Sequence, residues 1–471
     1  MLFHAQPCKP TRGPRMERKG EPMLGIEADI EGQVLPPQIE SWLATLPTPL
    51  LDIIKNLAEQ GHGVWLVGGA VRDAWLGQTA HLPDIDLATT CEPLETLRLF
   101  GDNAIPTGVD FGTVTVKAGD QQYEVTTLRT ESLYRDGRRP EQVAWGRSLL
   151  EDLSRRDFTF NSMAIDPLRG LFYDPFQGAK DLLDRTVRAV GIAQERCQED
   201  ALRILRAYRF LSRDDESIWA MEASLNDAVK RLASRLDMVA IERVWIELQK
   251  ILINKHTGAI LQKMKADGLF KTVLPSCGEV DDAVLRAIDE EPLSNLTPAQ
   301  CFAMLMFELP TKTLIQQTVT LRTSKEFQRH AASFHEHLQH LPSTDSPSLR
   351  VFDHVLGPEA GAHLLVRTVM ETALAERRNS APSKQLSAQR VLDAWSELAS
   401  RQSPEECLVD GHWLMQRTGI TQGIRLGRLK QWLHRLQIEQ DLTTIQQMES
   451  VLSRLAFEHG EHESWPRLTF P

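Results

Sequence analysis

Apolar residues near the N-terminus first repeat with a helical period and then form a short unbroken run. The helical period covers residues 39–46 and 50–57, and Pro47 and Pro49 separate the two stretches. The unbroken run at 64–67 is typical of a buried strand. This pattern predicts two helices followed by a strand.

Polar and apolar residues then alternate, which is the pattern of strands that bury one face. The alternation covers residues 84–88, 111–117 and 123–128. The last two stretches flank the turn-prone segment 118–120, so they predict a hairpin. We therefore expect a mixed α/β domain up to about residue 190.

Beyond Glu195 the strand signals nearly vanish. The apolar periods that predict helices lie at 201–211, 239–252, 259–264, 298–307, 388–398 and 426–436. Segments 340–349 and 378–387 are predicted loops. Residues 1–36 are rich in Pro, Gly and charge without an apolar period, so they predict a disordered leader.

Composition narrows the class of protein. The chain has 471 residues, of which 42% are hydrophobic, and this length suggests several structural units. It contains no apolar run long enough for a membrane span and no secretory signal pattern, so we expect a cytoplasmic protein without a membrane partner. The six cysteines form no C-x-x-C pair, which argues against a zinc ribbon or a disulfide framework.

The formal net charge of -11 argues against a nucleic-acid ligand only when it is averaged over the chain. Arginines concentrate between residues 155 and 213, so a basic surface can exist on this acidic protein.

Two aspartates, Asp84 and Asp86, are the first candidates for chemistry. Side chains two residues apart on a strand point to one face, with Cα atoms roughly 6–7 Å apart. A divalent cation such as Mg²⁺, which prefers oxygen ligands, would remove their mutual repulsion. Taken alone, an Asp-x-Asp pair is more often a solvated pair than a metal site.

A glycine pair precedes these aspartates. Gly68 and Gly69 follow the predicted strand 64–67, where backbone N–H groups can approach a triphosphate at a helix N-terminus. Arg72 would add a bidentate phosphate contact. An ordinary tight turn is the better explanation of the glycines by themselves, and the nearby aspartates favour the nucleotide site.

A third candidate is a polar stripe on the helix predicted near residue 200. Asp200, Arg203, Arg206 and Arg209 recur at every third residue and would wind slowly around that helix. An acceptor beside planar donors can pair with the Watson–Crick edge of a base. The alternative is a set of surface ion pairs with Glu199 and Asp200, each contributing about 0.2–0.5 kcal/mol.

Three segments resemble the ordered motifs of the class II tRNA nucleotidyltransferase and bacterial poly(A) polymerase family. They are 66–73 together with Asp84-Ile85-Asp86, then 151–164, then 199–210. The resemblance implies an α+β fold, in which a polymerase-beta-like nucleotidyltransferase head with a mixed sheet precedes an all-α neck, body and tail. The expected divisions are the leader 1–36, the head 37–189, the neck 190–275 with the nucleobase-reading helix, and the tRNA-binding body and tail 276–471.

The resemblance also implies roles for single residues. Asp84 and Asp86 would be catalytic and would hold Mg²⁺ ions in a two-metal scheme. Independently of the resemblance, Glu124 in the predicted hairpin is a possible third carboxylate, although a Glu on an alternating strand more often lies on the solvated face. The residues expected to bind the nucleotide are Gly68, Gly69, Arg72, Arg156, Asp200, Arg203, Arg206 and Arg209. Among them, Asp200 and Arg203 would select CTP or ATP without a nucleic-acid template.

Further segments favour one branch of this family. Residues 107–116, 124–131 and 136–140 look like the tRNA-maturing branch, and the basic segment of poly(A) polymerases is absent from the sequence. Residues 129–147 resemble a flexible loop that CC-only enzymes lack. The expected function is template-independent addition of CCA, or its terminal A, to the 3′ end of tRNA, using CTP and ATP with release of pyrophosphate.

Three alternatives remain at this point. They are a poly(A) polymerase, a tRNA nucleotidyltransferase that adds only CC or only A, and a catalytically inactive RNA-binding module. A metal phosphohydrolase is a weaker idea, suggested by His330, His335, His337, His340 and His354. No His-Asp pair with ligand spacing accompanies them, so we interpret these histidines as a solvated helix face.

Overall fold

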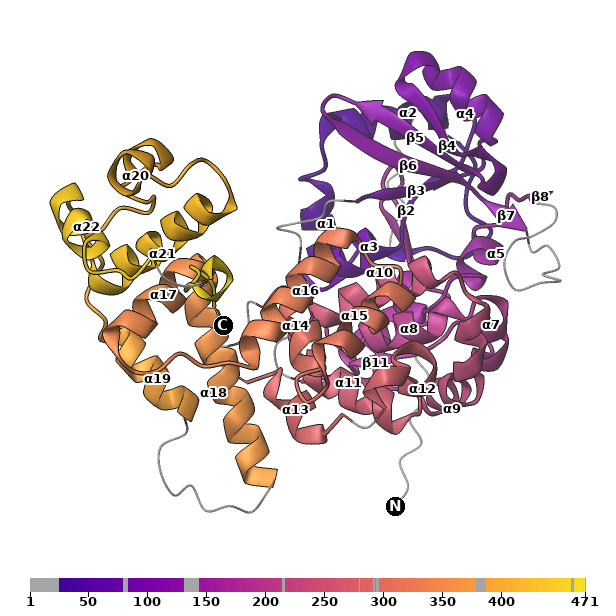
Figure 1. The fold of residues 1–471 in the computed structure, drawn as a ribbon. Coiled ribbons are helices and arrows are strands. Elements are labelled where there is room, and N and C mark those ends of the chain that lie inside the picture. Colours follow the sequence, from indigo (N-terminus) through magenta and orange to yellow (C-terminus); the bar gives the residue numbers. More distant parts are fainter. Residues whose placement is uncertain are drawn as a thin grey trace. The chain divides into compact units, whose positions relative to one another are not determined.

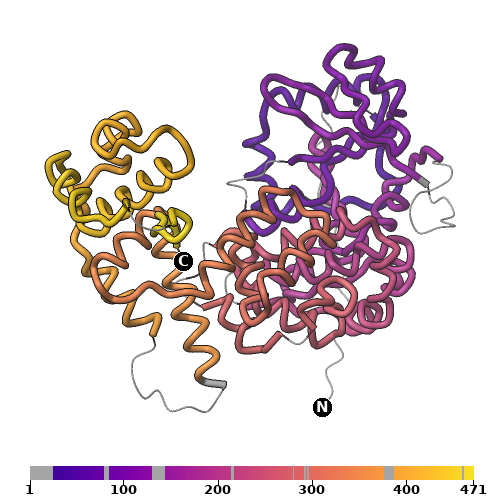
Figure 2. Tube along the Cα trace, in the orientation of Figure 1, coloured from indigo at the N-terminus to yellow at the C-terminus, as the bar shows by residue number. Residues whose placement is uncertain are grey.

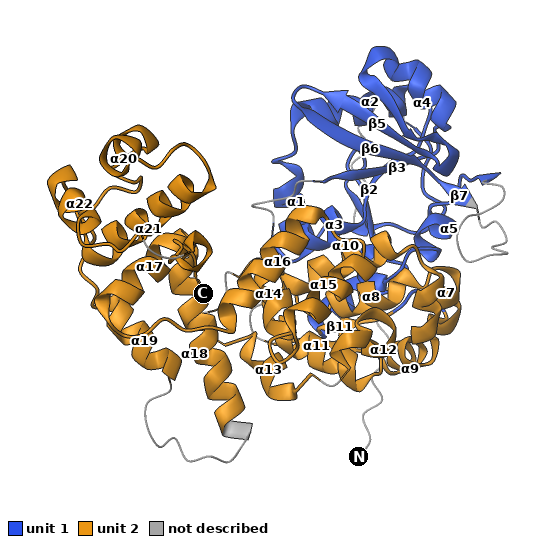
Figure 3. Ribbon diagram, in the orientation of Figure 1, with its two compact units in different colours: residues 1–184, 189–191 blue, residues 185–188, 192–471 orange. Residues whose placement is uncertain are grey.

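The computed structural model describes residues 25–78, 84–130, 144–213, 217–278, 280–290, 293, 296–377, 387–458 and 461–470. The chain divides into two compact units, which we call the head unit (1–184 and 189–191) and the helical unit (185–188 and 192–471) (Figure 3). Strands gather in the head unit, whereas helices dominate the helical unit (Figures 1 and 2). The predicted α+β class is confirmed.

An eight-stranded mixed sheet forms the centre of the head unit. Its order is β1 (Gln33–Val34), β10 (Leu171–Tyr173), β9 (Ala164–Asp166), β2 (Val64–Val67), β3 (Asp86–Thr89), β6 (Gln121–Thr127), β5 (Thr113–Ala118) and β4 (Ala104–Gly108). Strands β3 and β6 are parallel, and the other neighbours are antiparallel. The predicted hairpin is confirmed as β5–β6. A separate antiparallel pair consists of β7 (Arg129–Thr130) and β8 (Ala144–Trp145).

The register of β2 and β3 decides which loops share an end of the sheet. Val67 pairs with Asp86, and Val64 pairs with Thr89. All four residues of β2 are buried, so this strand lies in the core of the head unit. The turn after β2 and the start of β3 therefore meet at one end, and residues 62 and 91 lie toward the other.

Six α-helices lie within the described residues of the head unit. They are α1 (Pro37–Leu43), α2 (Thr48–Glu59), α3 (Gly69–Trp75), α4 (Pro93–Phe100), α5 (Leu149–Ser154) and α6 (Gly178–Leu183). Short 3-10 turns occur at Gly101–Asn103, Val109–Phe111 and Thr159–Asn161. The two helices predicted before the first strand are confirmed as α1 and α2, each of which begins beside a proline.

The leader prediction is wrong for residues 25–36. Strand β1 pairs with β10 at the edge of the sheet, and Ala28 and Ile30 pack against the head core. The Asp29 carboxylate accepts hydrogen bonds from the backbone N–H groups of Leu149 (2.8 Å) and Leu150 (3.2 Å) at the start of α5. These contacts join segments far apart in the chain, so no local apolar period predicts them. Residues 1–24 lie outside the described residues.

The helical unit is built from sixteen α-helices within the described residues. They are α7 (Ala193–Glu199), α8 (Leu202–Arg209), α9 (Ala223–Leu232), α10 (Ile241–Leu252), α11 (Thr257–Ala266), α12 (Phe270–Val273), α13 (Asp282–Ala287), α14 (Pro298–Leu305), α15 (Thr311–Thr320), α16 (Lys325–Leu338), α17 (Ser346–Leu356), α18 (Ala360–Arg377), α19 (Ser387–Ser396), α20 (Gly411–Thr418), α21 (Ile424–Gln440) and α22 (Ile445–Leu452). The six helical periods predicted beyond Glu195 are confirmed as α8, α10, α11, α14, α19 and α21.

Shorter elements complete the helical unit. Strands β11 (Thr186–Val187) and β12 (Ala220–Met221) form a parallel pair. The 3-10 turns are Ala233–Met238, Pro275–Cys277, Gly357–Glu359 and His462–Ser464. Among the helices described, none combines the length and the apolar content of a membrane span.

The predicted loop at 340–349 is shorter than expected. Helix α17 already begins at Ser346, because the Asp345 carboxylate accepts a hydrogen bond from the Ser348 N–H (3.0 Å) and caps the helix. Most of the second predicted loop, residues 378–386, lies outside the described residues.

The histidines around α16 do not form one solvated face. His330 and His340 are exposed, but His335 is fully buried, between the Thr311 hydroxyl and the Met306 carbonyl, each at 3.0 Å. The interpretation as a solvated face is therefore wrong for His335. A buried imidazole with partners at both nitrogens serves packing, and burial lowers its pKa.

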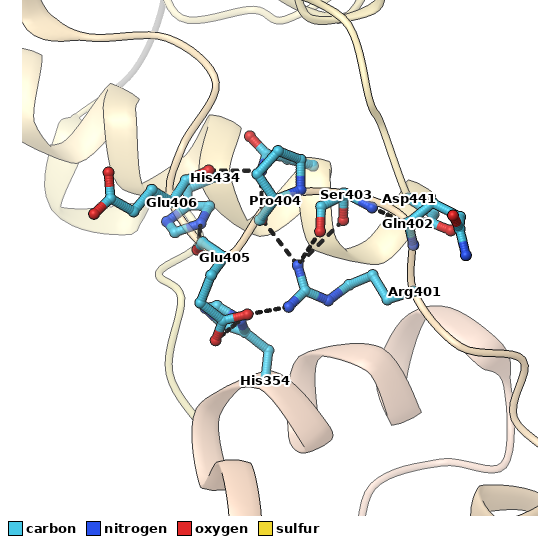
Figure 4. Close-up of polar contacts among 10 residues, drawn as sticks. His354, Arg401, Gln402, Ser403, Pro404, Glu405, Glu406, His434 and Asp441 are labelled. Carbon is cyan, nitrogen blue, oxygen red and sulfur yellow. Dashed lines mark hydrogen bonds and ion pairs between the residues drawn. The ribbon is translucent and has the colours of Figure 1, made fainter.

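His354 belongs to a cluster of ion pairs and hydrogen bonds that holds the segment between α19 and α20 in place (Figure 4). Its Nδ1 is 3.2 Å from Glu405 Oε1, and the same carboxylate pairs with Arg401. His434 Nε2 lies 3.0 Å from the Glu405 carbonyl oxygen. The cluster thus fastens this connection to both α17 and α21.

Candidate active site

The turn after β2 brings a glycine against two charged side chains. Gly68 has φ 76 and ψ -137, a conformation that glycine adopts readily and other residues adopt at a cost. A Cβ atom on Gly68 would lie 3.3 Å from Arg156 Nη1 and 3.5 Å from Asp86 Oδ2. The turn, the aspartate and the arginine therefore converge on one point of the head unit.

Three carboxylates act together at this point. The pKa of Asp86 is raised to about 6, chiefly by burial and also by the charges of Glu124 and Asp84, while Arg156 opposes the shift. Glu124 is close because Leu87 pairs with Val125 in the parallel β3–β6 ladder. The solvent exposure expected for Glu124 is observed, yet its charge still acts on Asp86.

The prediction that Asp84 and Asp86 lie on one strand is right for Asp86 and wrong for Asp84. Asp86 is the first residue of β3, whereas Asp84 and Ile85 precede the strand. Asp84 is exposed and Asp86 is half-buried, so the pair does not share a strand face. The charge of Asp84 nevertheless raises the pKa of the Asp86 carboxyl group. This set of oxygen donors suits a hard divalent cation, which would relieve the repulsion.

Arg156 is oriented by a buried acid. Its Nη2 donates to Asp152 Oδ2 at 3.1 Å, and Arg155 pairs with the other oxygen of the same carboxylate. Burial alone would raise the pKa of Asp152, but the two guanidinium groups hold it below its usual value. The Nε atom of Arg156 is buried without a hydrogen-bond partner among the described residues. Asp152 thus fixes the guanidinium beside Gly68.

Arg72 is largely engaged by the protein itself. Its side chain is buried and donates to both Asp73 oxygens, at 2.8 and 2.9 Å, and to Asn161 Oδ1 at 2.7 Å. The bond to Asn161 ties α3 to the 3-10 turn Thr159–Asn161. The phosphate contact expected of Arg72 stays a prediction, and the observed contacts assign it a bracing role.

Asp200 does not lie on the nucleobase-reading helix. Helix α7 ends at Glu199, and Asp200 has extended backbone angles, φ -138 and ψ 102, before α8 begins at Leu202. Its Oδ1 accepts the Leu202 N–H at 3.0 Å, which competes with helix continuation. Its Oδ2 pairs with Arg243 Nη2 at 3.0 Å. The predicted single polar stripe is therefore wrong at its first member.

The three arginines of α8 contact two different acids. Arg203 Nη1 donates to Glu199 Oε2 at 2.8 Å, so the ion pair that we considered as an alternative is present. Arg206 and Arg209 both face Glu247 of α10, with Nη1–carboxylate distances of 3.8 and 3.2 Å. Glu247 is only 4% exposed, so these pairs brace α8 against α10.

The sequence-predicted residues thus form two groups, each described within its own unit. The head unit brings together Gly68, Asp84, Asp86 and Arg156, with Gly69 and Arg72 in the adjoining helix. The helical unit holds Asp200, Arg203, Arg206 and Arg209. Their roles at the nucleotide stay predictions.

Three residues that orient these groups were not predicted from the sequence. Asp152, Arg243 and Glu247 each pair with a predicted site residue. The i,i+4 spacing of Asp152 and Arg156 is a signal that could have found the first. The other two pairs join residues far apart in the chain, so local spacing carries no sign of them.

Comparison with known proteins follows the same division of the chain. A family model described as Poly A polymerase head domain matches residues 64–188. A second model, described as probable RNA and SrmB- binding site of polymerase A, matches residues 220–279. The CCA-adding enzyme of Streptococcus sanguinis (strain SK36) is 33% identical over 391 residues, which cover 82% of this chain and 92% of the relative. The chain belongs to the CCA-adding enzyme family.

Other members of the CCA-adding enzyme family are also similar. The enzyme of Streptococcus suis (strain 05ZYH33) is 39% identical over 281 residues, covering 59% of this chain and 68% of the relative. The structure of the Bacillus stearothermophilus CCA-adding enzyme in complex with CTP has a TM-score of 0.67 and 25% identity, and the match covers 89% of this chain and 98% of that one.

A second solved structure supports the fold alone. The Thermotoga maritima CCA-adding enzyme complexed with tRNA has a TM-score of 0.57 at 21% identity, over 88% of this chain and 98% of that one. The resemblance seen in the motifs and the predicted enzyme class, a nucleotidyltransferase, are confirmed by the family.

Proposed function

We propose that this chain adds CCA, or its terminal A, to the 3′ end of tRNA from CTP and ATP, without a template and with release of pyrophosphate. The observation that carries the proposal is the convergence of Asp86 and Arg156 on the Gly68 turn, in a chain of the CCA-adding enzyme family. The relative solved with CTP supports this nucleotide as a substrate, and membership of the CCA-adding enzyme family supports tRNA as the acceptor. We place the activity in the cytoplasm.

The acids of the head unit fit a metal-assisted transfer. We propose that Asp84 and Asp86 hold Mg²⁺, with Glu124 adding negative charge beside them. Such ions, when bound, assist attack by the RNA 3′ hydroxyl and departure of pyrophosphate. Arg156, held by Asp152, would offer its guanidinium to the triphosphate, where a planar donor fork binds oxygens in pairs. The Gly68 turn leaves room for the phosphates to approach the backbone.

Base selection would rest on the helical unit. We propose that Asp200, held by Arg243, and Arg203, held by Glu199, present an acceptor and a donor fork to the edge of the base. A base with the wrong edge would leave the atoms that face it without a partner on the base, which lowers the affinity for that nucleotide. Selection then needs no nucleic-acid template.

The direct test uses three tRNA substrates, ending before the tail, after its first C and after its second C. Each is incubated with labelled CTP or ATP and purified full-length chain. A complete enzyme adds C to the first two and a single A to the third. Addition that stops after CC, or that occurs only on the third substrate, identifies the partial enzymes. Long A tails identify a poly(A) polymerase, and no incorporation on any substrate contradicts the proposal.

A further inference from the structure

Three side chains of different chemistry meet at the end of β2 and β3 that lies away from Gly68. His62 follows α2, Cys91 follows β3, and Glu95 lies in the first turn of α4. One potential ligand atom from each residue lies within 4.8 Å of the other two. The His62 Nε2 and Glu95 Oε2 atoms are 3.5 Å apart.

One buried polar atom of this group, His62 Nε2, lacks a hydrogen bond in the part of the chain that the structure describes. His62 Nε2 is buried without a hydrogen-bond partner among the described residues, although the Glu95 carboxylate is near. Buried polar atoms without partners are rare, because the hydration that they lose on folding is not replaced. Cys91 is fully buried, whereas the Glu95 side chain is 51% exposed. The group therefore has a closed side and a side that solvent can reach.

The backbone around the group is held in place independently. The Gly63 N–H donates to the Thr90 hydroxyl at 2.9 Å, and the Thr89 hydroxyl donates to the Gly63 carbonyl at 2.8 Å. These bonds join the residues next to His62 and Cys91. A ligand set supported in this way is ordered before any ion binds.

We propose that His62, Cys91 and Glu95 bind a zinc ion, with water at the fourth position. Zinc accepts imidazole, thiolate and carboxylate ligands at about 2.0–2.3 Å, so ligand atoms at a tetrahedral ion lie about 3.3–3.7 Å apart. The His62–Glu95 distance of 3.5 Å has that value already. Mg²⁺ prefers oxygen donors alone, so the Asp84 and Asp86 pair and this trio suit different cations.

The zinc ion would join three elements that contact the same part of the sheet. It would link the end of α2, the loop after β3 and the start of α4. An ion that binds only the folded chain stabilises it in proportion to the logarithm of its concentration over Kd. The function of the site is thus to stabilise the head unit, at the end of the strands away from Asp86.

Ionisation of the thiol gives the site a pH dependence. Burial raises the pKa of Cys91 to about 11 when no metal is bound. Zinc binding must displace this proton, so affinity rises with pH, by up to about tenfold per pH unit around neutrality.

Cobalt is the probe that separates this site from the carboxylates of the active site. Full-length chain is titrated with Co²⁺ in excess Mg²⁺, and the thiolate-to-cobalt charge-transfer band is recorded. We expect one equivalent to produce the band, Zn²⁺ to abolish it, and Cys91→Ala to lack it. Cys301→Ala removes a buried cysteine outside the group and keeps the band. Zinc raises the Tm of the wild type but not that of Cys91→Ala.

Glu95→Gln keeps the test decisive if Cys91→Ala folds poorly, because Glu95 is exposed and its replacement leaves the core intact. We expect at least a tenfold weaker affinity for Co²⁺, with unchanged circular dichroism. A wild-type titration without a thiolate band overturns the proposal. So does a band of unchanged affinity in Glu95→Gln.

Discussion

Gly68 shows at the scale of one residue how backbone and chemistry are coupled. Its positive φ lets β2 turn into α3, and its missing side chain leaves room for Arg156 and Asp86. Gly61 also has a positive φ, of 88, but a Cβ there would meet nothing within 4 Å. The two glycines therefore separate backbone strain from crowding of the site.

Gly68→Ala should abolish nucleotide transfer and lower the free energy of unfolding by about 1–2 kcal/mol. Gly61→Ala should cost similar stability while transfer persists, because only the backbone is strained there. Urea unfolding and CTP incorporation measure the two effects. Full transfer by Gly68→Ala would show that the space at the turn is not used by substrate.

Substitution of Arg203 tests the proposed selection of the base. Arg203→Ala should relax the preference for CTP and ATP more than it weakens triphosphate affinity, because it removes a donor from the base edge. Loss of its Glu199 pair should cost only about 0.5 kcal/mol of stability. Incorporation of all four nucleotides in competition measures selectivity, with the exposed Arg322→Ala as control. Unchanged selectivity would remove Arg203 from the reading site.

The residues of the candidate site could be predicted from the sequence more reliably than the groups that they contact. The convergence of Asp86 with the Gly68 turn follows from strand alternation and the motif order. The position of Asp200 between α7 and α8 did not follow, because one hydrogen bond to the Leu202 N–H ends the helical run. Spacing of residues cannot show which side-chain bond will replace a backbone one.

At the scale of elements, apolar period predicted the helices well and their polar faces poorly. Helix α16 carries an exposed His330 and a buried His335, since α14 and α15 contact one of its faces. Helix α18 contacts another region of α16, where His363 stacks on Phe334 with ring centroids 3.9 Å apart. A histidine in the sequence does not reveal which neighbour will cover it.

His363 makes the α16–α18 packing sensitive to acid. Burial lowers its pKa to about 3, from an ordinary 6.5, and both ring nitrogens lack hydrogen-bond partners among the described residues. Between these values the unfolded chain binds the proton and the native chain does not. Stability therefore falls as the pH drops from about 6.5 toward 3.

His363→Phe should remove this contribution and raise the free energy of unfolding by about 1 kcal/mol at pH 7, because two orphaned nitrogens disappear. Between pH 7 and pH 5 the variant should lose about 2 kcal/mol less of its free energy of unfolding than the wild type does, as measured by urea unfolding at both pH values. His330→Phe, at an exposed position, should leave the pH dependence unchanged. An identical acid sensitivity in His363→Phe would contradict the assignment.

At the scale of the whole molecule, the chain combines a mixed-sheet head unit with a helical unit, and each contributes one part of the proposed reaction. The change from strand to helical periods near residue 190 made this architecture predictable. Ion pairs such as Glu247 with α8, and the sheet contacts of residues 25–36, depend on distant segments that no local period records. Those parts required the structure.

The central claim is that the acids beside the Gly68 turn perform metal-assisted nucleotide transfer. Asp84→Asn tests it most directly, with tRNA binding and CTP incorporation measured on the same preparation. The claim predicts tRNA affinity near that of the wild type and no incorporation, while the exposed Asp120→Asn in the hairpin turn keeps both. Undiminished incorporation by Asp84→Asn would contradict it.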